Sequence, residues 1–251
     1  MSLVHHFPIN ETGRDFVIGD IHGEFALVRE AMRRIQFDTS KDRLFCCGDL
    51  IDRGADSARA LRFLQLSFVH SCRGNHENNF LEIHADGEPS DRVLQWFADK
   101  MGAHWWLKLG ASERKRFLAL FERMPIAIEV ETRQGPVGIV HANVPARMPW
   151  PTFKSLIEQG DDTAIAAALE SRSRIKYRDC SGVQGVHRVY VGHSPQWDGA
   201  LSLGNVVALD SGAFRSDEGK GHLTIAEIDV AISLFDQSRS PVEHVCAITR
   251  A

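Results

Sequence analysis

Three short apolar segments in the first third of the chain each stop at a polar cluster, and this pattern restricts the fold more than any other feature. The segments cover residues 16–18, 44–47 and 68–72. Between the first two, residues 24–35 place apolar side chains at helical spacing, and Asp56 can cap a second helix before the third. Strands that alternate with helices in this way predict parallel pairing with right-handed crossovers.

Candidate ligands follow the carboxyl ends of these predicted strands, which is the edge where open α/β sheets bind ligands. Four of them follow the three segments, and two end later predicted strands. In chain order they are Asp20, His22, Asp49, Asn75, His141 and His193. Taken singly, the Asp and Asn residues could be turn or helix-cap residues. Their combination with the histidines favours a shared metal site.

The rest of the chain alternates helical and strand patterns without a linker, a repeat or a low-complexity tract. Helices are predicted at 91–100, 112–123, 152–159 and 163–172, and strands at 126–131, 137–140, 189–191, 206–209, 223–228 and 230–235. The tryptophans at positions 96, 105 and 106 are expected in the core or in groove walls. We expect one domain over residues 1–251, with an α/β fold in which a second, hairpin-rich sheet packs on the first.

Composition narrows the class of partner. The net charge of −4 argues against a nucleic-acid-binding protein, which usually shows a basic excess. The chain has no apolar run of transmembrane length, and its start lacks the pattern of a signal peptide. Its five cysteines follow no disulfide spacing. We therefore expect a cytoplasmic protein that binds neither nucleic acid nor membrane.

The ligand types indicate hard or borderline metals. Asp20 and His22 stand two residues apart, so both side chains can reach one ion from an extended segment. Carboxylate, imidazole and amide donors suit Mn²⁺, with Fe or Zn²⁺ as alternatives. Six ligands are too many for one catalytic ion with an open position, but they fit two ions if one carboxylate bridges. Asp49 is the expected bridge because it follows the middle strand.

The neighbours of these ligands suit phosphate chemistry. Arg53 follows Asp49 closely, and its guanidinium fork matches phosphate oxygens. His76 stands next to Asn75 and could protonate a leaving oxygen. Asp52 could bind His76 through a hydrogen bond and keep it oriented and charged.

Three motifs resemble the signatures of a known family. Residues 19–23, 48–54 and 74–77 read Gly-Asp-Ile-His-Gly, Gly-Asp-Leu-Ile-Asp-Arg-Gly and Gly-Asn-His-Glu. In order and spacing they resemble the phosphoprotein phosphatase family of metal-dependent serine/threonine phosphatases, in particular its bacterial and bacteriophage members. The likeness continues through the later histidine motifs to residues 209–213.

The resemblance implies a metallophosphatase-type sandwich of two mixed β-sheets flanked by helices. It also implies hydrolysis of phosphoserine and phosphothreonine in phosphoproteins by direct attack of a hydroxide that bridges two metals, with phosphotyrosine or small phosphoesters as further possible substrates. The first metal would be held by Asp20, His22 and Asp49, and the second by Asp49, Asn75, His141 and His193.

The resemblance assigns the remaining roles as well. His76 would be the general acid, paired with Asp52, and Arg53 would bind phosphate. A second phosphate-binding arginine is expected within residues 171–175, where we favour Arg172 and leave Arg174 open.

Two alternative functions remain at this stage. A dinucleoside tetraphosphate hydrolase uses a related scaffold, but the presence of Asp52 and Glu77 favours a phosphatase. An alternative of another class is a catalytically dead scaffold that binds phosphopeptides. No expected ligand and no expected acid is missing from the chain, which favours an enzyme.

Overall fold

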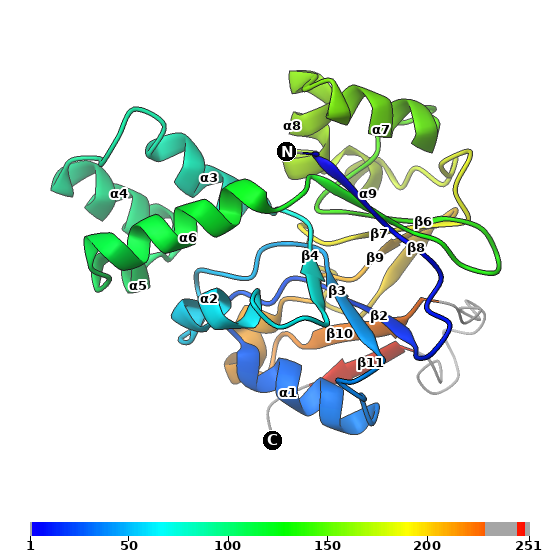
Figure 1. Ribbon diagram of the computed structural model, residues 1–251, viewed down its shortest axis with the longest axis horizontal. Helices are drawn as coiled ribbons and strands as arrows, with labels where there is room; N and C mark the ends of the chain where they lie inside the picture. The colour runs from blue at the N-terminus through cyan, green and yellow to red at the C-terminus, as the bar shows by residue number, and fades with distance from the viewer. Residues whose placement is uncertain (1, 229–244, 249–251) are drawn as a thin grey trace.

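The computed structural model describes residues 2–228 and 245–248. Two β-sheets pack face to face, and helices cover their outer faces (Figure 1). This two-sheet α/β architecture confirms the expected fold class.

The first sheet contains the three strands that lead into the candidate ligands. Among the described residues its order is β11-β10-β2-β3-β4. Strands β2 (Asp15–Ile18), β3 (Arg43–Cys46) and β4 (Val69–Ser71) are parallel, as predicted. Helix α1 (Phe25–Arg34), then η1 (Ser57–Arg59) with α2 (Ala60–Phe63), form the crossovers.

The predicted hairpin that closes this sheet can be compared with the structure only in its first strand. Strand β10 (Leu223–Glu227) pairs antiparallel with β2 and with β11 (Val245–Ile248). The strand predicted at 230–235 lies outside the described residues.

The second sheet has the order β1-β5-β6-β7-β9-β8 within the described part of the chain. Its strands are β1 (Val4–Phe7), β5 (Ala127–Val130), β6 (Val137–Val140), β7 (Arg188–Val191), β8 (Leu201–Leu203) and β9 (Val206–Ala208). The hairpin predicted from β5 to β6 is present and antiparallel. Strands β1 and β8 were not predicted, because each is short and lies at a sheet edge.

The alternation of side chains along β2 and β3 explains why the first two apolar segments are buried on both faces. Phe16 packs with the helices outside the sheet, whereas Val17 packs between the two sheets. Leu44 and Phe45 divide in the same way in β3. Because neighbouring side chains in a strand point to opposite faces, a continuous apolar run is what a strand buried on both faces requires.

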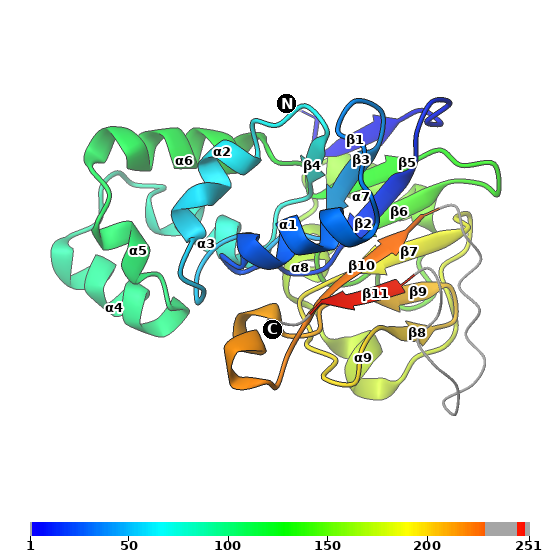
Figure 2. The same cartoon turned by 90° about the horizontal axis from the view of Figure 1, so that it is seen from below.

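Two groups of helices flank the sheets. Helices α3 (Asn75–Ile83), α4 (Asp91–Met101), α5 (His104–Leu107) and α6 (Ala111–Arg123) extend as a lobe beyond one end of the sandwich (Figure 1, Figure 2). Helices α7 (Trp150–Glu158), α8 (Asp162–Glu170) and α9 (Ser173–Tyr177) cover the second sheet. A short 3-10 segment, η2 (Ala213–Glu218), precedes β10. No helix in the described residues is long and apolar enough to cross a membrane.

Helix α8 ends earlier than predicted. The sequence pattern continues to Arg172, but the helix stops at Glu170 because Ser171 adopts an extended backbone with ψ of 123°. A new short helix, α9, then starts at Ser173. The break determines how the two candidate arginines of this segment are oriented.

Candidate metal centre

The loops after β2 and β3 are joined through their backbones. The N–H groups of Ile21 and His22 both donate to the carbonyl of Asp49, at 3.1 and 2.9 Å. In return, the N–H of Gly54 donates to the carbonyl of His22 at 2.9 Å. These bonds hold the first two ligand-bearing loops in one fixed arrangement.

Several residues of these loops and of the loop after β7 have a left-handed backbone, which is costly for residues other than glycine. Their φ angles lie between 46° and 70°, and the residues are His22, Asp49, Asp52, Arg53 and His193. Such conformations persist where the surrounding contacts enforce them, and they cluster at functional sites. The sequence had marked all five as site residues, on chemical grounds alone.

Three imidazoles direct one ring nitrogen into the same small space and anchor the other on a backbone carbonyl. The anchoring nitrogens are His22 Nδ1, His141 Nδ1 and His193 Nε2, at 2.8, 2.8 and 3.1 Å from their carbonyl oxygens. Since a carbonyl only accepts, each anchoring nitrogen carries the proton. The opposite nitrogen then presents a lone pair, which is the usual state of a metal-binding histidine.

The carboxylate of Asp49 lies between two groups of possible ligands. One group joins Asp49 with His22 and His76, and the other joins it with His141 and His193. The Nε2 atoms of His22 and His141 lie 3.6 and 3.5 Å from Asp49 Oδ2. The geometry therefore gives a candidate site for two metal ions that share one carboxylate.

The amide of Asn75 completes the second group. Its Oδ1 lies 2.9 Å from His141 Nε2 and 3.0 Å from His193 Nδ1. These two nitrogens are themselves 3.1 Å apart. Because both nitrogens face inward with lone pairs, three electron-pair donors crowd one point, which is where a cation fits.

Asp20 lies at the edge of the first group. Its two carboxylate oxygens accept the backbone N–H of His193 at 2.9 and 3.1 Å. Its Oδ2 is 4.0 Å from His22 Nε2. The tighter first group contains His76 instead, which the sequence assigned to proton transfer.

Burial and mutual repulsion shift the pKa values of the carboxylates in the site. Burial, together with the charges of Asp210 and Asp49, raises the pKa of Asp20 well above its usual value. Burial also raises the pKa of Asp210, to about 6. Burial would likewise raise the pKa of Asp49, but the imidazoles around it outweigh this effect and hold its pKa below its usual value. Close carboxylates of this kind are stabilised by a divalent cation.

The pKa values of the three anchored imidazoles are lowered, which favours their neutral form. Burial is the main cause in each case, and it lowers the pKa of His22 and of His141. Burial and the neighbouring His141 lower the pKa of His193 to about 3. Neutral imidazoles are the form that binds metals, so these three histidines are in their metal-binding form at neutral pH.

His76 and Asp52 form a buried pair beside Asp49. The Nδ1–H of His76 donates to Asp52 Oδ2 at 2.6 Å, and Asp52 is fully buried. The other carboxylate oxygen accepts the indole N–H of Trp105 at 2.7 Å. Trp105 was expected in the core or in a groove wall, so its hydrogen bond to Asp52 is a role that the sequence did not reveal.

The exposed guanidinium of Arg53 lies against the first ligand group, which joins Asp49, His22 and His76. It contacts His22 Nε2 at 2.8 Å and His76 Nε2 at 3.1 Å. It also stacks over the ring of Phe214 at 4.5 Å, and this ring packs edge-on against His22. The exposed indole of Trp197 extends the aromatic surface, 6.4 Å from Phe214. Sequence reasoning missed both aromatic residues.

A carboxylate that was not expected in the site holds the ligand loops together. Glu77 is fully buried and accepts the backbone N–H groups of Asp49, Leu50 and Gly74 at 3.0, 2.8 and 2.9 Å. Burial and the charge of Asp49 raise its pKa to about 7. Gly74 must be glycine because a Cβ there would lie 2.2 Å from Asp49 Oδ1.

The two candidate arginines after α8 point in different directions. Arg174 is buried and donates to the side chain of Asn143 and to the carbonyl of Val144 at 3.2 Å each. Arg172 is exposed and donates to Ser194 Oγ at 3.3 Å, next to the candidate ligand His193. Arg172 is thus the arginine on the side of the metal centre.

Comparison with known proteins agrees with this geometry. The model of the calcineurin-like phosphoesterases matches residues 16–205, which is most of the chain and includes every candidate ligand. The chain belongs to this family. The family relationship confirms the resemblance seen in the sequence motifs.

Two curated relatives are similar to this chain over most of their length, and a third over half of its length. Serine/threonine-protein phosphatase 1 of Salmonella typhimurium is 32% identical over 85% of this chain and 91% of its own. Serine/threonine-protein phosphatase 2 of Escherichia coli is 34% identical over 80% of this chain and 88% of its own. A symmetrical bis(5'-nucleosyl)-tetraphosphatase of Methylococcus capsulatus is 30% identical, but over only 61% of this chain and 50% of its own.

A solved structure supports the fold. A serine/threonine phosphatase from Saccharomyces cerevisiae superposes with a TM-score of 0.65, covering 100% of this chain and 84% of its own, at 17% identity. At that identity the likeness concerns the fold alone, and it agrees with the two-sheet architecture described above.

Proposed function

We propose that this protein is a metal-dependent serine/threonine protein phosphatase, formed by one domain over residues 1–251. The observation that carries the proposal is the position of Asp49 between two ligand groups, beside the buried pair of His76 and Asp52. When bound, two divalent ions would activate a water molecule and neutralise charge on the phosphate. The nitrogen and oxygen donors favour Mn²⁺, with Fe or Zn²⁺ as alternatives.

In this proposal Asp20, His22 and Asp49 hold one ion. The second ion is held by Asp49, Asn75, His141 and His193. The carbonyl anchors of the three imidazoles support these assignments, because they fix the ring orientation and the proton position.

The phosphate is bound by Arg53 and Arg172 in our proposal. The guanidinium of Arg53 contacts the Nε2 atoms of His22 and His76, and an incoming phosphate with its oxygens in the same place would take over these hydrogen bonds. The move of Arg53 to the phosphate leaves His76 Nε2 free to carry the proton that the general acid needs. Arg172 is exposed on the side of His193 and completes a cationic cradle. Arg174 is already committed to protein partners, which favours Arg172.

His76 donates the proton to the leaving alkoxide, and Asp52 positions and charges it. Burial lowers the pKa of His76, but the charge of Asp49 and the hydrogen bond to Asp52 outweigh burial and leave the pKa raised. A raised pKa keeps the ring protonated near neutral pH, as a general acid requires. The retention of acid and ligands argues against a dead phosphopeptide-binding scaffold.

A side activity on phosphotyrosine is also part of the proposal. Phe214 and Trp197 continue from Arg53 as an aromatic wall, against which an aryl ring could pack. A nucleobase could use the same wall, so the tetraphosphate hydrolase remains the alternative to test.

We further propose a cytoplasmic location. Cys46, Cys47 and Cys72 are buried and unpaired, and Cys180 is exposed and unpaired. An exposed free thiol fits a reducing compartment.

The decisive experiment compares substrates under defined metal. Purified protein is assayed with phosphoserine, phosphothreonine and phosphotyrosine peptides and with a dinucleoside tetraphosphate, before and after chelation and Mn²⁺ addition. We expect phosphoserine and phosphothreonine peptides to be the best substrates, with activity lost on chelation. Faster turnover of the dinucleotide would replace the proposal with the hydrolase. Full activity in His76→Asn would contradict the proposed acid.

A further inference from the structure

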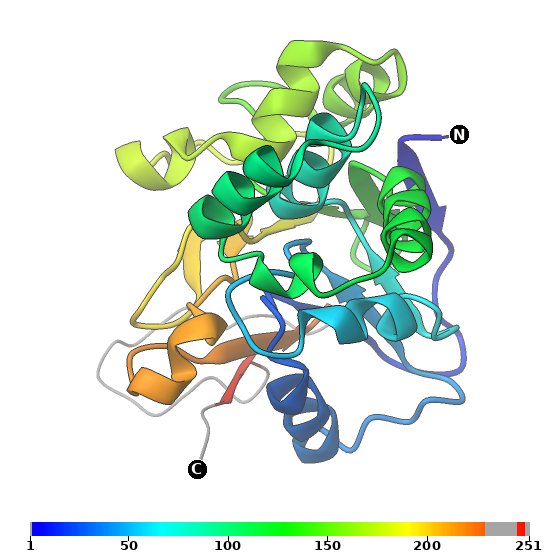
Figure 3. The same cartoon turned by 90° about the vertical axis from the view of Figure 1, so that its left-hand side faces the viewer.

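A groove between α1 and the η1–α2 segment is lined by none of the candidate ligands. Its two walls lie side by side on the outer face of the first sheet (Figure 1, Figure 3). Its volume of 470 Å³ falls in the range of ligand pockets, roughly 300–1,000 Å³. Its apolar lining consists of Phe25, Val28, Met32, Phe63, Leu66 and Phe68.

The rest of the lining is cationic. Arg29 comes from α1, whereas Arg59 and Arg62 come from the opposite wall, and no carboxylate lines the groove in the described part of the chain. Arg59 pairs with Asp56 at 3.1 Å. Arg29 and Arg62 are exposed and have no ion-pair partner among the residues described. On a protein of net charge −4, this is an apolar surface with unneutralised positive charge.

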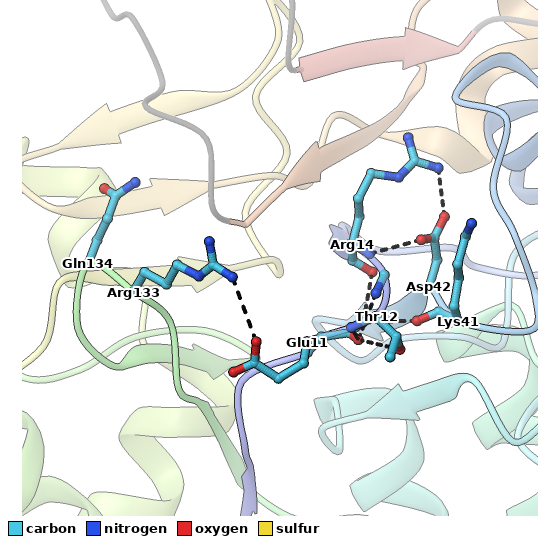
Figure 4. Close-up of a pocket in the computed structure, with 9 residues that line it drawn as sticks. Glu11, Thr12, Arg14, Lys41, Asp42, Arg133 and Gln134 are labelled. Atoms are coloured by element: carbon cyan, nitrogen blue, oxygen red, sulfur yellow. Dashed lines mark hydrogen bonds and ion pairs between the residues drawn. The ribbon is translucent and has the colours of Figure 1, made fainter.

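A second cavity provides a contrast to this groove, because the charges around it are neutralised by ion pairs within the protein. It holds 610 Å³ and lies at the opposite end of β2 and β3 from the ligands (Figure 4). Four of its charged side chains pair with one another, Arg14 with Asp42 at 2.6 Å and Arg133 with Glu11 at 3.7 Å. The fifth, Lys41, pairs with Asp38 at 3.2 Å. The groove beside α1 lacks such internal neutralisation, so its charges are available to a ligand.

We propose that the α1/η1–α2 groove docks an acidic amphipathic helix of a partner protein, and that docking changes turnover at the metal centre. The apolar floor accepts one face of the helix, in the manner of other helix-in-groove complexes. Leu66 is 38% exposed and supplies apolar area that docking would bury. Because the arginines stand on both walls, the ligand must carry carboxylates on both sides, which favours a peptide over a fatty acid with its single charge.

The walls of the groove run directly into the ligand loops, which gives docking a route to the site. Helix α1 begins at Phe25, shortly after His22, and η1 begins at Ser57, shortly after Arg53. The packing between the loops leaves no slack, since a Cβ on Gly23 would lie 2.8 Å from both Gly54 O and Ser57 Oγ. Because the two loops contact each other this closely, strain from a helix docked between the walls would be transmitted to His22 and Arg53.

The test uses a designed probe on the intact protein. A fluorescein-labelled helical peptide carries Leu at positions i, i+3, i+4 and i+7 and Glu elsewhere, and a control peptide has Lys in place of every Glu. We expect saturable, salt-sensitive binding of the Glu peptide only. The double variant Arg29→Glu/Arg62→Glu should weaken binding about tenfold. The matched control Arg92→Glu/Arg116→Glu reverses two exposed charges on α4 and α6 and should bind as the unmodified protein does.

Three outcomes would overturn the docking proposal. They are equal binding of the Lys peptide, unchanged binding by the folded Arg29→Glu/Arg62→Glu variant, and binding of oleate without binding of the Glu peptide. Leu66→Asp provides a second variant if the first fails to fold. The anisotropy assay needs no substrate, so its result is independent of the proposed phosphatase activity. Binding that leaves p-nitrophenyl phosphate turnover unchanged would overturn the coupling to the metal centre.

Discussion

The Nδ1 atom of His76 lies 2.6 Å from Oδ2 of Asp52, and both side chains are shielded from solvent. The carboxylate is held from its other side by the indole N–H of Trp105. This arrangement fixes the ring so that Nε2, 3.8 Å from Asp49 Oδ2, faces the metal centre. If His76 is the general acid that we propose, it should depend on Asp52 for both its orientation and its charge.

The first prediction concerns the pH dependence of Asp52→Asn. The Asp52 carboxylate helps to raise the pKa of His76, so its loss lowers that pKa. In its proposed role His76 acts when protonated, so activity should be lost as pH rises through this pKa. The basic limb of the kcat/KM profile should therefore move to lower pH, with kcat reduced roughly 10- to 100-fold. An unshifted limb would show that another group supplies the proton.

The second prediction concerns metal stoichiometry. Because Asp49 belongs to both ligand groups, Asp49→Ala should lose both ions, whereas His193→Ala should keep about one of two. Metal analysis after dialysis in Mn²⁺ measures this directly. Asp86→Ala removes an exposed carboxylate in the α3–α4 connection and serves as the control. Equal metal content in Asp49→Ala and in the control would rule out the shared-carboxylate site.

The third prediction separates the two arginines after α8. Arg172→Ala should raise KM for a phosphopeptide about tenfold, because one charged phosphate contact of about 1.5 kcal/mol is lost. Its Tm should not change. Arg174→Ala should instead lower the free energy of unfolding by about 2 kcal/mol, because it leaves buried acceptors without a donor. The reverse pattern would transfer the phosphate-binding role to Arg174.

The fourth prediction concerns the aromatic wall. Trp197→Ala should lower the ratio of kcat/KM for phosphotyrosine over phosphoserine peptides roughly two- to tenfold. Trp96→Ala removes another exposed indole, on α4, and should leave the ratio unchanged. If both variants keep the ratio of the unmodified protein, the wall does not select aryl groups.

The fifth prediction concerns the packing of α7 on the second sheet. A Cβ on Gly138 would lie 2.7 Å from ring atoms of Trp150, which is fully buried. Gly138→Ala should therefore lower the free energy of unfolding by about 1–3 kcal/mol, as measured in urea. The activity of the folded fraction should persist. An unchanged midpoint would mean that the indole can move aside without cost.

Much of the site follows from local sequence. Apolar runs of three to five residues require buried strands, and a strand that stops at Asp20 or Asp49 places that residue at the ligand-binding edge. The residue types then limit the metal and the reaction. The order and spacing of the motifs indicated the protein family, which the comparison with known proteins confirmed.

The fixed positions of these groups depend on contacts between residues far apart in the chain. The carbonyl of Cys47 anchors His141, 94 residues later, and Trp105 binds Asp52 across 53 residues. Glu77 joins two loops through backbone N–H groups that have no sequence signature. No periodicity encodes such bonds, because they exist only once the strands are side by side.

The sequence by itself therefore determined which side chains are available for chemistry and at which edge of the sheet they gather. The tertiary structure decided their orientation, because the left-handed backbone at His22 and Asp49 and the early end of α8 arise from packing between segments. That end of α8 is what turns Arg172 toward His193 and buries Arg174. Orientation depends on the surrounding contacts, and only the folded chain supplies them.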